Sequence, residues 1–283
     1  MRWAALGVVY VVWGSTYLGI RFSIETMPPL LSAGARFVTA GLILALFLRG
    51  RMRMTWPQFG TAVLIGLLLP AWGNGLVVVA QQSVPSGLAA LLVASVPLYV
   101  VLLRRIGGDR PPVVTYAGVV LGMVGLAVLL LDDVGGSTWW GPWLVLLAAF
   151  GWALGSYLSG RLPSADPFAM SAVEMVTGGV ALTLVGVFAG EHVVLSEVSA
   201  SSWWAWGYLV VFGSLLAFSA YVYVLGQLPV STVATYAYVN PVIAVVLGLW
   251  LAGERFGPFQ LVGGLLVVLA VVLVVRAERN CRT

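Results

Sequence analysis

The stretch Pro229–Pro241, PVSTVATYAYVNP, indicates the fold of this chain when it is set beside an earlier stretch, Pro85–Pro97, PSGLAALLVASVP. Both stretches begin and end with proline and lie within longer apolar runs. An interior proline removes a backbone hydrogen bond and kinks a helix. In a bilayer, a broken helix is tolerated only where it lines a cavity or is buried in protein. We therefore expect helix breaks at Pro97 and Pro241 beside a transport site, although single prolines are also common in membrane helices.

The composition excludes a soluble domain. Hydrophobic residues make up 61% of the chain and charged residues only 8%, whereas a soluble domain carries roughly 25% charged residues. All 14 basic residues are arginines scattered between apolar blocks, so no nucleic-acid patch is expected. One cysteine, Cys281, and one histidine, His192, leave no basis for a disulfide or a metal cluster. A lysine-containing nucleotide loop is absent from the sequence, and no cofactor or metal is expected.

Ten apolar blocks divide the chain, each about twenty residues long, the length that crosses a ~30 Å hydrocarbon core. They run over residues 3–20, 30–48, 58–79, 84–103, 112–131, 140–159, 168–189, 204–225, 230–251 and 258–275. We therefore expect an all-α polytopic membrane protein with ten transmembrane helices. The first block is expected to be a retained helix rather than a cleaved signal peptide.

The arginines predict the orientation. Eleven of them fall on one side of the membrane: Arg2, Arg49, Arg51, Arg53, Arg104, Arg105, Arg110, Arg161, Arg276, Arg279 and Arg282. Only Arg21 and Arg255 fall on the other side, and Arg36 lies within a block. By the positive-inside rule, both termini are expected in the cytoplasm and the chain in the cell (inner) membrane.

Matching residues recur in the same order in both halves. They are Pro29 and Pro167, Arg36 and Glu174, Thr39 and Thr177, Gly41 and Gly179, and Gly118 and Gly263. A five-helix unit is thus duplicated, with units expected at residues 1–135 and 136–283, the second ending in a short cytoplasmic tail. Because five is odd, the second unit must enter the membrane inverted, which lets one sequence form two oppositely facing states.

Two stretches resemble EamA-type carriers of the drug/metabolite transporter superfamily. They are WGSTYLGIRFSIETMPPLLSAGARF at residues 13–37 and GERFGPFQLVGGLLVVLAVVL at residues 253–273. The resemblance covers the whole chain and implies two EamA repeats in a permease, often an exporter, of amino acids or other small metabolites. It also implies a central cavity lined mainly by the first, third, fourth, sixth, eighth and ninth helices. These motifs identify the superfamily well and the substrate poorly.

Polar and aromatic side chains at helical spacing on these helices form the expected substrate-binding set. The set comprises Trp13, Thr16, Tyr17, Trp72, Asn74, Ser95, Tyr99, Trp152, Ser156, Ser219, Tyr223, Thr232, Tyr236 and Asn240. Wide rings with hydroxyl or amide tips suit an amphipathic organic solute, although each aromatic taken alone is more typical of lipid or helix contacts. The glycine pairs at 118/122 and 151/155 favour internal packing, so a monomer is expected, with a dimer as the alternative.

Two charged residues lie inside apolar blocks, Arg36 and Glu174. An arginine at membrane depth costs about 2.5–3.5 kcal/mol on insertion scales, so Arg36 should face protein or water. It is expected either to bind a substrate carboxylate or, alternatively, to hold the carbonyls of a broken helix or extend toward the surface. Glu174 is the candidate for proton coupling or a cation site, with a structural role as the alternative. The inversion places the two near opposite surfaces, so no direct salt bridge is expected.

The sequence favours a secondary transporter that moves small organic metabolites, amino acids or related amphipathic solutes, by alternating access and in the outward direction. Its expected partners are the solute, the lipid bilayer and, through Glu174, protons. The alternative is a proton-coupled exporter of lipophilic cations, which aromatic faces and Glu174 would hold. A nucleotide-sugar carrier is less favoured because no basic cluster is present. An enzyme is not expected, because no aspartate pair lies within the blocks and His192 lies in a loop.

Overall fold

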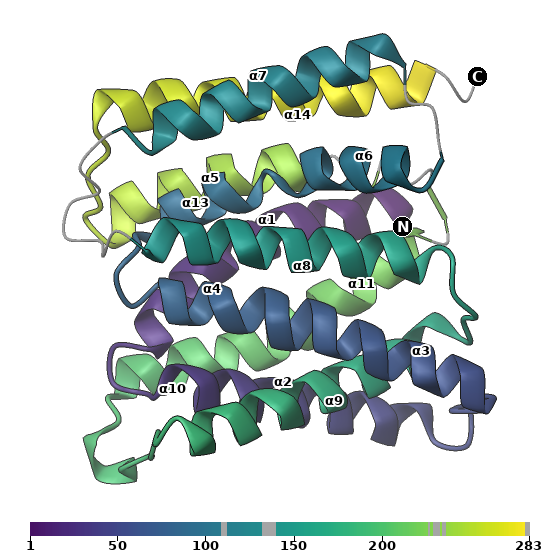
Figure 1. Ribbon diagram of the computed structural model, residues 1–283. Coiled ribbons are helices and arrows are strands. Elements are labelled where there is room, and N and C mark those ends of the chain that lie inside the picture. The colour runs from purple at the N-terminus through teal and green to yellow at the C-terminus, as the bar shows by residue number, and fades with distance from the viewer. Residues whose placement is uncertain (109–111, 132–139, 226, 229–232, 234–235, 281–283) are drawn as a thin grey trace.

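The computed structural model describes residues 1–108, 112–131, 140–225, 227–228, 233 and 236–280, which form a bundle of helices with no strand among them (Figure 1). The elements are α1 (Arg2–Ser23), α2 (Pro29–Leu48), α3 (Trp56–Gly66), η1 (Leu67–Asn74), α4 (Gly75–Ala80), α5 (Ser86–Val93), α6 (Val96–Ile106), α7 (Val113–Leu129), α8 (Gly141–Ser159), α9 (Pro167–Phe188), η2 (Leu195–Glu197), α10 (Ala200–Tyr208), η3 (Leu209–Leu216), α11 (Ala217–Leu225), α13 (Tyr236–Leu251) and α14 (Pro258–Asn280). The expected all-α class is confirmed.

Within the described residues, seven helices are long and apolar enough to cross a membrane. They are Arg2–Ser23, Pro29–Leu48, Trp56–Ala80, Ser86–Ile106, Gly141–Ser159, Pro167–Phe188 and Ala200–Tyr221. Three shorter apolar stretches occupy the fifth, ninth and tenth expected blocks: Val113–Leu129, which is α7, Val239–Leu251 within α13 and Pro258–Val274 within α14. At 17 residues, α7 rises about 26 Å, slightly less than the ~30 Å core. The count of ten transmembrane helices therefore stays a prediction.

Proline and glycine mark the helix boundaries. Pro29 is the first residue of α2 and Pro167 the first of α9, positions where the missing N–H costs nothing. Gly50 follows α2 with φ 52°, and Gly190 follows α9 with φ 79°. A left-handed residue just past a helix favours glycine, which has no Cβ to clash. Corresponding helices of the two halves thus begin and end with the same chemistry.

Helices α2 and α9 pack closely side by side (Figure 1, bottom). A Cβ on Gly34 would lie 2.8 Å from the Gly179 carbonyl oxygen, and a Cβ on Gly179 would lie 2.8 Å from that of Gly34. Farther along α2, a Cβ on Gly41 would lie 2.9 Å from the Ala172 carbonyl oxygen. As the residue number rises along α2, from Gly34 to Gly41, the residue number of the partner on α9 falls, from Gly179 to Ala172. The two helices are therefore antiparallel.

Helices α7 and α14 pack in the same manner (Figure 1, top). A Cβ on Gly125 would lie 3.0 Å from the Gly263 carbonyl oxygen, and one on Gly263 would lie 2.7 Å from that of Gly125. Gly118 lies against Ala270, where a Cβ would come within 3.2 Å of the carbonyl oxygen. Glycine at these positions lets the two backbones approach, as in other tightly packed membrane helices.

The two proline-bounded stretches have different structures. Helix α5 ends at Val93 and α6 begins at Val96, so the chain is interrupted just before Pro97, which lies in the first turn of α6. Helix α13, by contrast, runs through Pro241 without a break. The Pro241 ring removes the one bond that an N–H would make to the carbonyl of Ala237, and the helix continues to Leu251. The break expected at Pro241 is therefore not seen, and residues 229–232 and 234–235 lie outside the described residues.

Two π-helical segments, η1 and η3, interrupt the third and eighth expected helices. Each is eight residues long, and they lie at corresponding places in the two halves. A π segment has a wider turn than an α-helix and frequently occurs at functional sites. Neither segment is predicted from the sequence.

Candidate functional site

A cavity lies in the middle of the bundle, where helices of both halves meet. It is lined by Trp13, Thr16, Tyr17, Ile20, Arg36, Phe37, Pro70, Gly73, Asn74, Val77, Ala90, Val93, Ala94, Val96, Trp152, Gly213, Phe218, Tyr236, Ala237, Asn240 and Pro241. Both π segments contribute to the wall, through Pro70, Gly73 and Asn74 of η1 and Gly213 of η3. An apolar wall with a few polar groups is the usual composition of a small-molecule site.

Aromatic rings form one side of this cavity, with Trp13 of α1 at their centre. The Trp13 ring lies 4.8 Å from the ring of Tyr221, 5.3 Å from Tyr236 and 6.2 Å from Trp152. Tyr221 and Tyr236 also meet edge to face at 5.8 Å. The Trp13 indole N–H donates to the carbonyl of Gly213 at 3.3 Å, which fixes the ring against η3. Such mutually packed rings form a rigid apolar surface.

Arg36 is buried, with 5% of its surface exposed, and is the only charged residue among the lining residues. Its Nε donates to the hydroxyl of Ser214 at 3.0 Å, and its guanidinium carbon lies 4.5 Å from the Phe37 ring centroid. No ion pair involving Arg36 occurs within the described part of the chain. A guanidinium held on one edge by a neutral hydroxyl keeps its positive charge available for an anionic group.

Polar groups from α1 and α13 complete the wall. The amide of Asn240, in the orientation that its neighbours require, donates to the carbonyls of Tyr10 at 3.0 Å and Tyr236 at 3.3 Å. The Thr16 hydroxyl donates to the Trp13 carbonyl at 2.7 Å. Part of the hydrogen-bonding capacity of both side chains is therefore used within the protein. Asn240 in particular connects α13 to α1.

The structure brings about half of the expected substrate-binding residues to this cavity. Trp13, Thr16, Tyr17, Arg36, Asn74, Trp152, Tyr236 and Asn240 line it. Trp72, Ser95, Tyr99, Ser156, Ser219 and Tyr223 do not line it. Thr232 lies outside the described residues.

The residues away from the cavity have other contacts. Trp72 is 43% exposed, and its indole N–H donates to the Leu147 carbonyl at 2.9 Å, beside Gly151 of α8. The Ser156 hydroxyl donates to a carbonyl of its own helix at 2.8 Å. Tyr99 packs edge to face on another aromatic ring, at 5.7 Å. Ser95 is fully buried, and its hydroxyl has no partner among the described residues.

Glu174 is buried on α9 and does not line the cavity. Its backbone lies against Gly66, where a Cβ would come within 2.6 Å of the Glu174 carbonyl oxygen. No ion pair between Glu174 and Arg36 is found in the part of the chain that the structure describes. Arg36 and Glu174 are therefore not paired with each other in the described residues.

Sequence reasoning missed several contributors to the site. Ser214 and Gly213 belong to η3, and the turn geometry that presents them is not encoded in a simple helical spacing. Tyr221 is part of the aromatic cluster, and its spacing from Phe218 on α11 was an available signal. The apolar residues around the α5–α6 interruption, such as Ala94, carry no recognisable signal of their own.

Comparison with known proteins identifies the class. The model of the EamA-like transporter family matches residues 1–131 and again 139–276. The uncharacterized inner membrane transporter YedA of Escherichia coli (strain K12) is 40% identical over 276 residues, covering 95% of this chain and 89% of that protein. A probable amino-acid metabolite efflux pump of the same organism is 25% identical over 285 residues, covering 92% of this chain and 90% of that protein. A solved crystal structure with 19% identity has a TM-score of 0.69 and covers 99% of this chain and 98% of its own.

The chain belongs to the EamA-like transporter family, and the resemblance seen in its sequence is thereby confirmed. It is accordingly a membrane transporter of a small molecule. The likeness to the solved structure concerns the fold alone. The boundary between the two expected units, at residues 135 and 136, lies outside the described residues and stays a prediction.

Proposed function

We propose that this chain is a secondary carrier for a small amphipathic metabolite with a carboxylate, most simply an amino acid, which it exports by alternating access. The observation that carries the proposal is a cavity in which Arg36 is the only charged residue among the described lining residues, next to a wall of packed aromatic rings. The guanidinium suits the carboxylate, and the rings suit the apolar part of the solute. One relative is described as a probable amino-acid metabolite efflux pump, which is the same class.

The proposed architecture is ten transmembrane helices in two inverted repeats. The correspondence between the halves carries Gly34 onto Ala172 and Gly41 onto Gly179. The close contacts follow the same rule, because Gly34 meets Gly179 and Gly41 meets Ala172. A two-fold axis that exchanges the halves produces this reciprocal pattern, and the antiparallel packing of α2 and α9 suits an axis in the membrane plane.

Two further features support the same symmetry. Gly118 corresponds to Gly263, and Gly125 to Ala270, and these four residues also meet crosswise between α7 and α14. The π segments η1 and η3 fall at corresponding places in the proposed units 1–135 and 136–283. Symmetric halves with a site between them are the basis of alternating access in many secondary carriers.

The proposed location is the inner membrane, with both termini in the cytoplasm. The arginine distribution supports this orientation. Helix α1 begins and α14 ends at the same end of the bundle (Figure 1), as an even number of transmembrane helices requires. The relative YedA is described as an inner membrane transporter. We propose a monomer, because the reciprocal glycine contacts lie inside one chain.

The alternative, a proton-coupled exporter of lipophilic cations, has weaker support. A cation in the cavity would face Arg36, and Glu174, the acid expected to attract it, is not among the lining residues. Proton coupling through Glu174 is kept as a proposal that the flux assay below tests. If it operates, Glu174 acts from a position between α9 and the third helix rather than by direct contact with the solute.

The test is flux into proteoliposomes. The solute panel holds aromatic, aliphatic and acidic amino acids and one lipophilic cation, each with and without a pH gradient. We expect saturable movement of an amino acid. The variant Arg36→Gln should raise the half-saturating concentration by about tenfold or more, because a hydrogen bond to a charged group contributes about 1.5–3 kcal/mol. Arg36→Lys should recover part of this loss, since it restores the charge without the planar fork.

The matched control is Tyr223→Phe, a conservative change at a residue outside the cavity lining. Arg36→Gln behaving like Tyr223→Phe would contradict the carboxylate site. Movement of the cation alone, dependent on the pH gradient and abolished in Glu174→Gln, would replace the proposal with the drug–proton alternative.

A further inference from the structure

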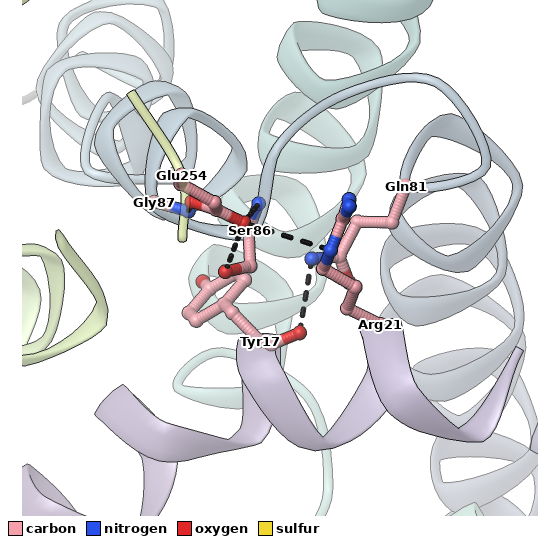
Figure 2. Close-up of polar contacts among 6 residues, drawn as sticks. All are labelled: Tyr17, Arg21, Gln81, Ser86, Gly87 and Glu254. Carbon is pink, nitrogen blue, oxygen red and sulfur yellow. Dashed lines mark hydrogen bonds and ion pairs between the residues drawn. The ribbon is translucent and has the colours of Figure 1, made fainter. Parts of the chain in front are cut away.

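A second polar cluster joins the two halves of the chain (Figure 2). Glu254, in the segment between α13 and α14, accepts hydrogen bonds from the backbone N–H of Ser86 at 2.6 Å, the hydroxyl of Ser86 at 2.7 Å and the N–H of Gly87 at 3.0 Å. The Arg21 Nε lies 3.9 Å from the same carboxylate. The Glu254 side chain is 3% exposed and that of Arg21 is 39% exposed, so the acid is buried and the base partly solvated.

The Glu254 carboxylate supplies the hydrogen-bond acceptors that the first N–H groups of α5 lack within their own segment. Ser86 and Gly87 open α5, and the first N–H groups of a helix have no partner within it. The preceding residue, Pro85, has no side-chain acceptor to cap them. A carboxylate from the other half takes this place, and its charge suits the positive end of the helix. Gly248 leaves room for the Glu254 carboxylate, since a Cβ at residue 248 would lie 3.0 Å from the Glu254 carboxyl carbon.

Helix α5 connects this cluster to the cavity. Ala90 and Val93, near the other end of the helix, line the cavity. On the α1 side, the Gln81 amide donates to the Tyr17 carbonyl at 3.0 Å, and the same tyrosine lines the cavity (Figure 2). The capped turn and the cavity wall are thus two ends of one helix of eight residues.

We propose that Glu254 is a positioning residue of the transport cycle: its bonds to the first turn of α5 hold this end of the cavity closed, and their release lets α5 separate from α13. The proposal rests on the proposed function, because it requires a carrier that opens to two faces. A buried carboxylate that loses its donors is strongly destabilised. The three bonds are therefore expected to break together as water enters, which gives two discrete states.

Glu191 offers a matched comparison. Its carboxylate accepts from the N–H groups of Leu30 at 3.1 Å and Leu31 at 2.8 Å, so it also caps a helix of the first half from the second half. Glu191 follows α9, however, and α2 is packed along α9 by the contact of Gly34 with Gly179. This cap joins two helices that are already tightly packed, so its loss should not open the cavity.

The test measures access to the cavity without any solute. A cysteine at Val77, which lines the cavity on α4, is introduced in a Cys281→Ser background. A membrane-impermeant thiol reagent is applied to intact cells and, separately, to inverted vesicles. In Glu254→Gln we expect the labelling rate to rise by about tenfold from the face where Glu254 lies and to fall from the other face. Glutamine keeps one acceptor and adds a donor, so one N–H of α5 loses its partner.

Ser86→Ala serves as a second variant, because it removes one of the three bonds and should give a smaller change in the same direction. It keeps the test decisive if Glu254→Gln fails to fold. Unchanged labelling in Glu254→Gln and Ser86→Ala, or an equal rise in Glu191→Gln, would overturn the proposal. A chain that moves none of the tested solutes still gives this labelling result, so failure of the proposed function is seen separately in the flux assay.

Discussion

At the scale of single residues, Trp13 has the most ring contacts in the cavity wall, and it anchors the wall to Gly213. We expect Trp13→Ala to raise the half-saturating solute concentration by up to about tenfold, because it removes a ring from the proposed binding wall for the apolar part of the solute, and an aromatic contact contributes about 0.5–1.5 kcal/mol beyond buried area. The measurement is the concentration dependence of flux in proteoliposomes. Trp72→Phe is the control, since Trp72 is exposed outside the cavity, and equal losses in both variants would exclude a special role for Trp13.

Some residues of the cavity wall were predictable from the sequence, and others were not. Trp13, Thr16 and Tyr17 share a helical face, and regular α1 carries that face to the cavity as expected. Trp72 and Asn74 were assigned together, yet only Asn74 lines the cavity, because side chains two residues apart on a helix point to nearly opposite sides. A hydroxyl such as that of Ser156 bonds to its own helix, and sequence alone does not reveal this choice.

At the scale of elements, the contact between α2 and α9 depends on having no side chain at the crossing. Gly179→Ala places a Cβ within 2.8 Å of backbone atoms of α2, which cannot move aside as a flexible side chain would. We expect a loss of about 1–3 kcal/mol in stability, typical of an overpacked interior. Thermal unfolding in detergent measures it. Gly60→Ala is the control, since no atom lies within 4 Å of its added Cβ, and an equal shift for the two variants would count against this contact.

Element boundaries were predictable where proline and glycine set them, as in α2 and α9. The interruption before Pro97 was also expected, since the residues around it cannot continue a regular hydrogen-bond ladder. Pro241 gave no break, because α13 continues past the single backbone bond that the proline ring removes. Whether a proline interrupts a helix depends on how the neighbouring helices pack against it. The sequence alone does not reveal that packing.

At the scale of the whole molecule, the orientation can be checked through the single cysteine. If residue 281 lies in the cytoplasm, an impermeant thiol reagent should label it in inverted vesicles and leave it unlabelled in intact cells. Detergent-solubilised protein provides the full-labelling reference. Labelling of intact cells would reverse the orientation and assign the Glu254 cluster to the cytoplasmic face.

The family and the all-helical class were accessible from the sequence because both depend on composition and on long motifs that cover the chain. The position of the cavity was only partly accessible, since it arises where the two halves meet. The cap on α5 was not accessible, although Glu254 lies inside a motif that was recognised. Its acceptor role depends on a helix start far away in the sequence, at Ser86.

The crosswise glycine contacts are not fully symmetric, because Gly34 corresponds to Ala172, which carries one methyl group more. In a carrier that alternates as proposed, such a difference would make the two facing conformations unequal in energy. A difference of about 1.4 kcal/mol changes their resting ratio tenfold, and the apparent affinity on each face changes with that ratio. Gradients still fix the net direction of transport. Single methyl groups far from the solute nevertheless give evolution a means of adjusting which compartment the empty carrier samples.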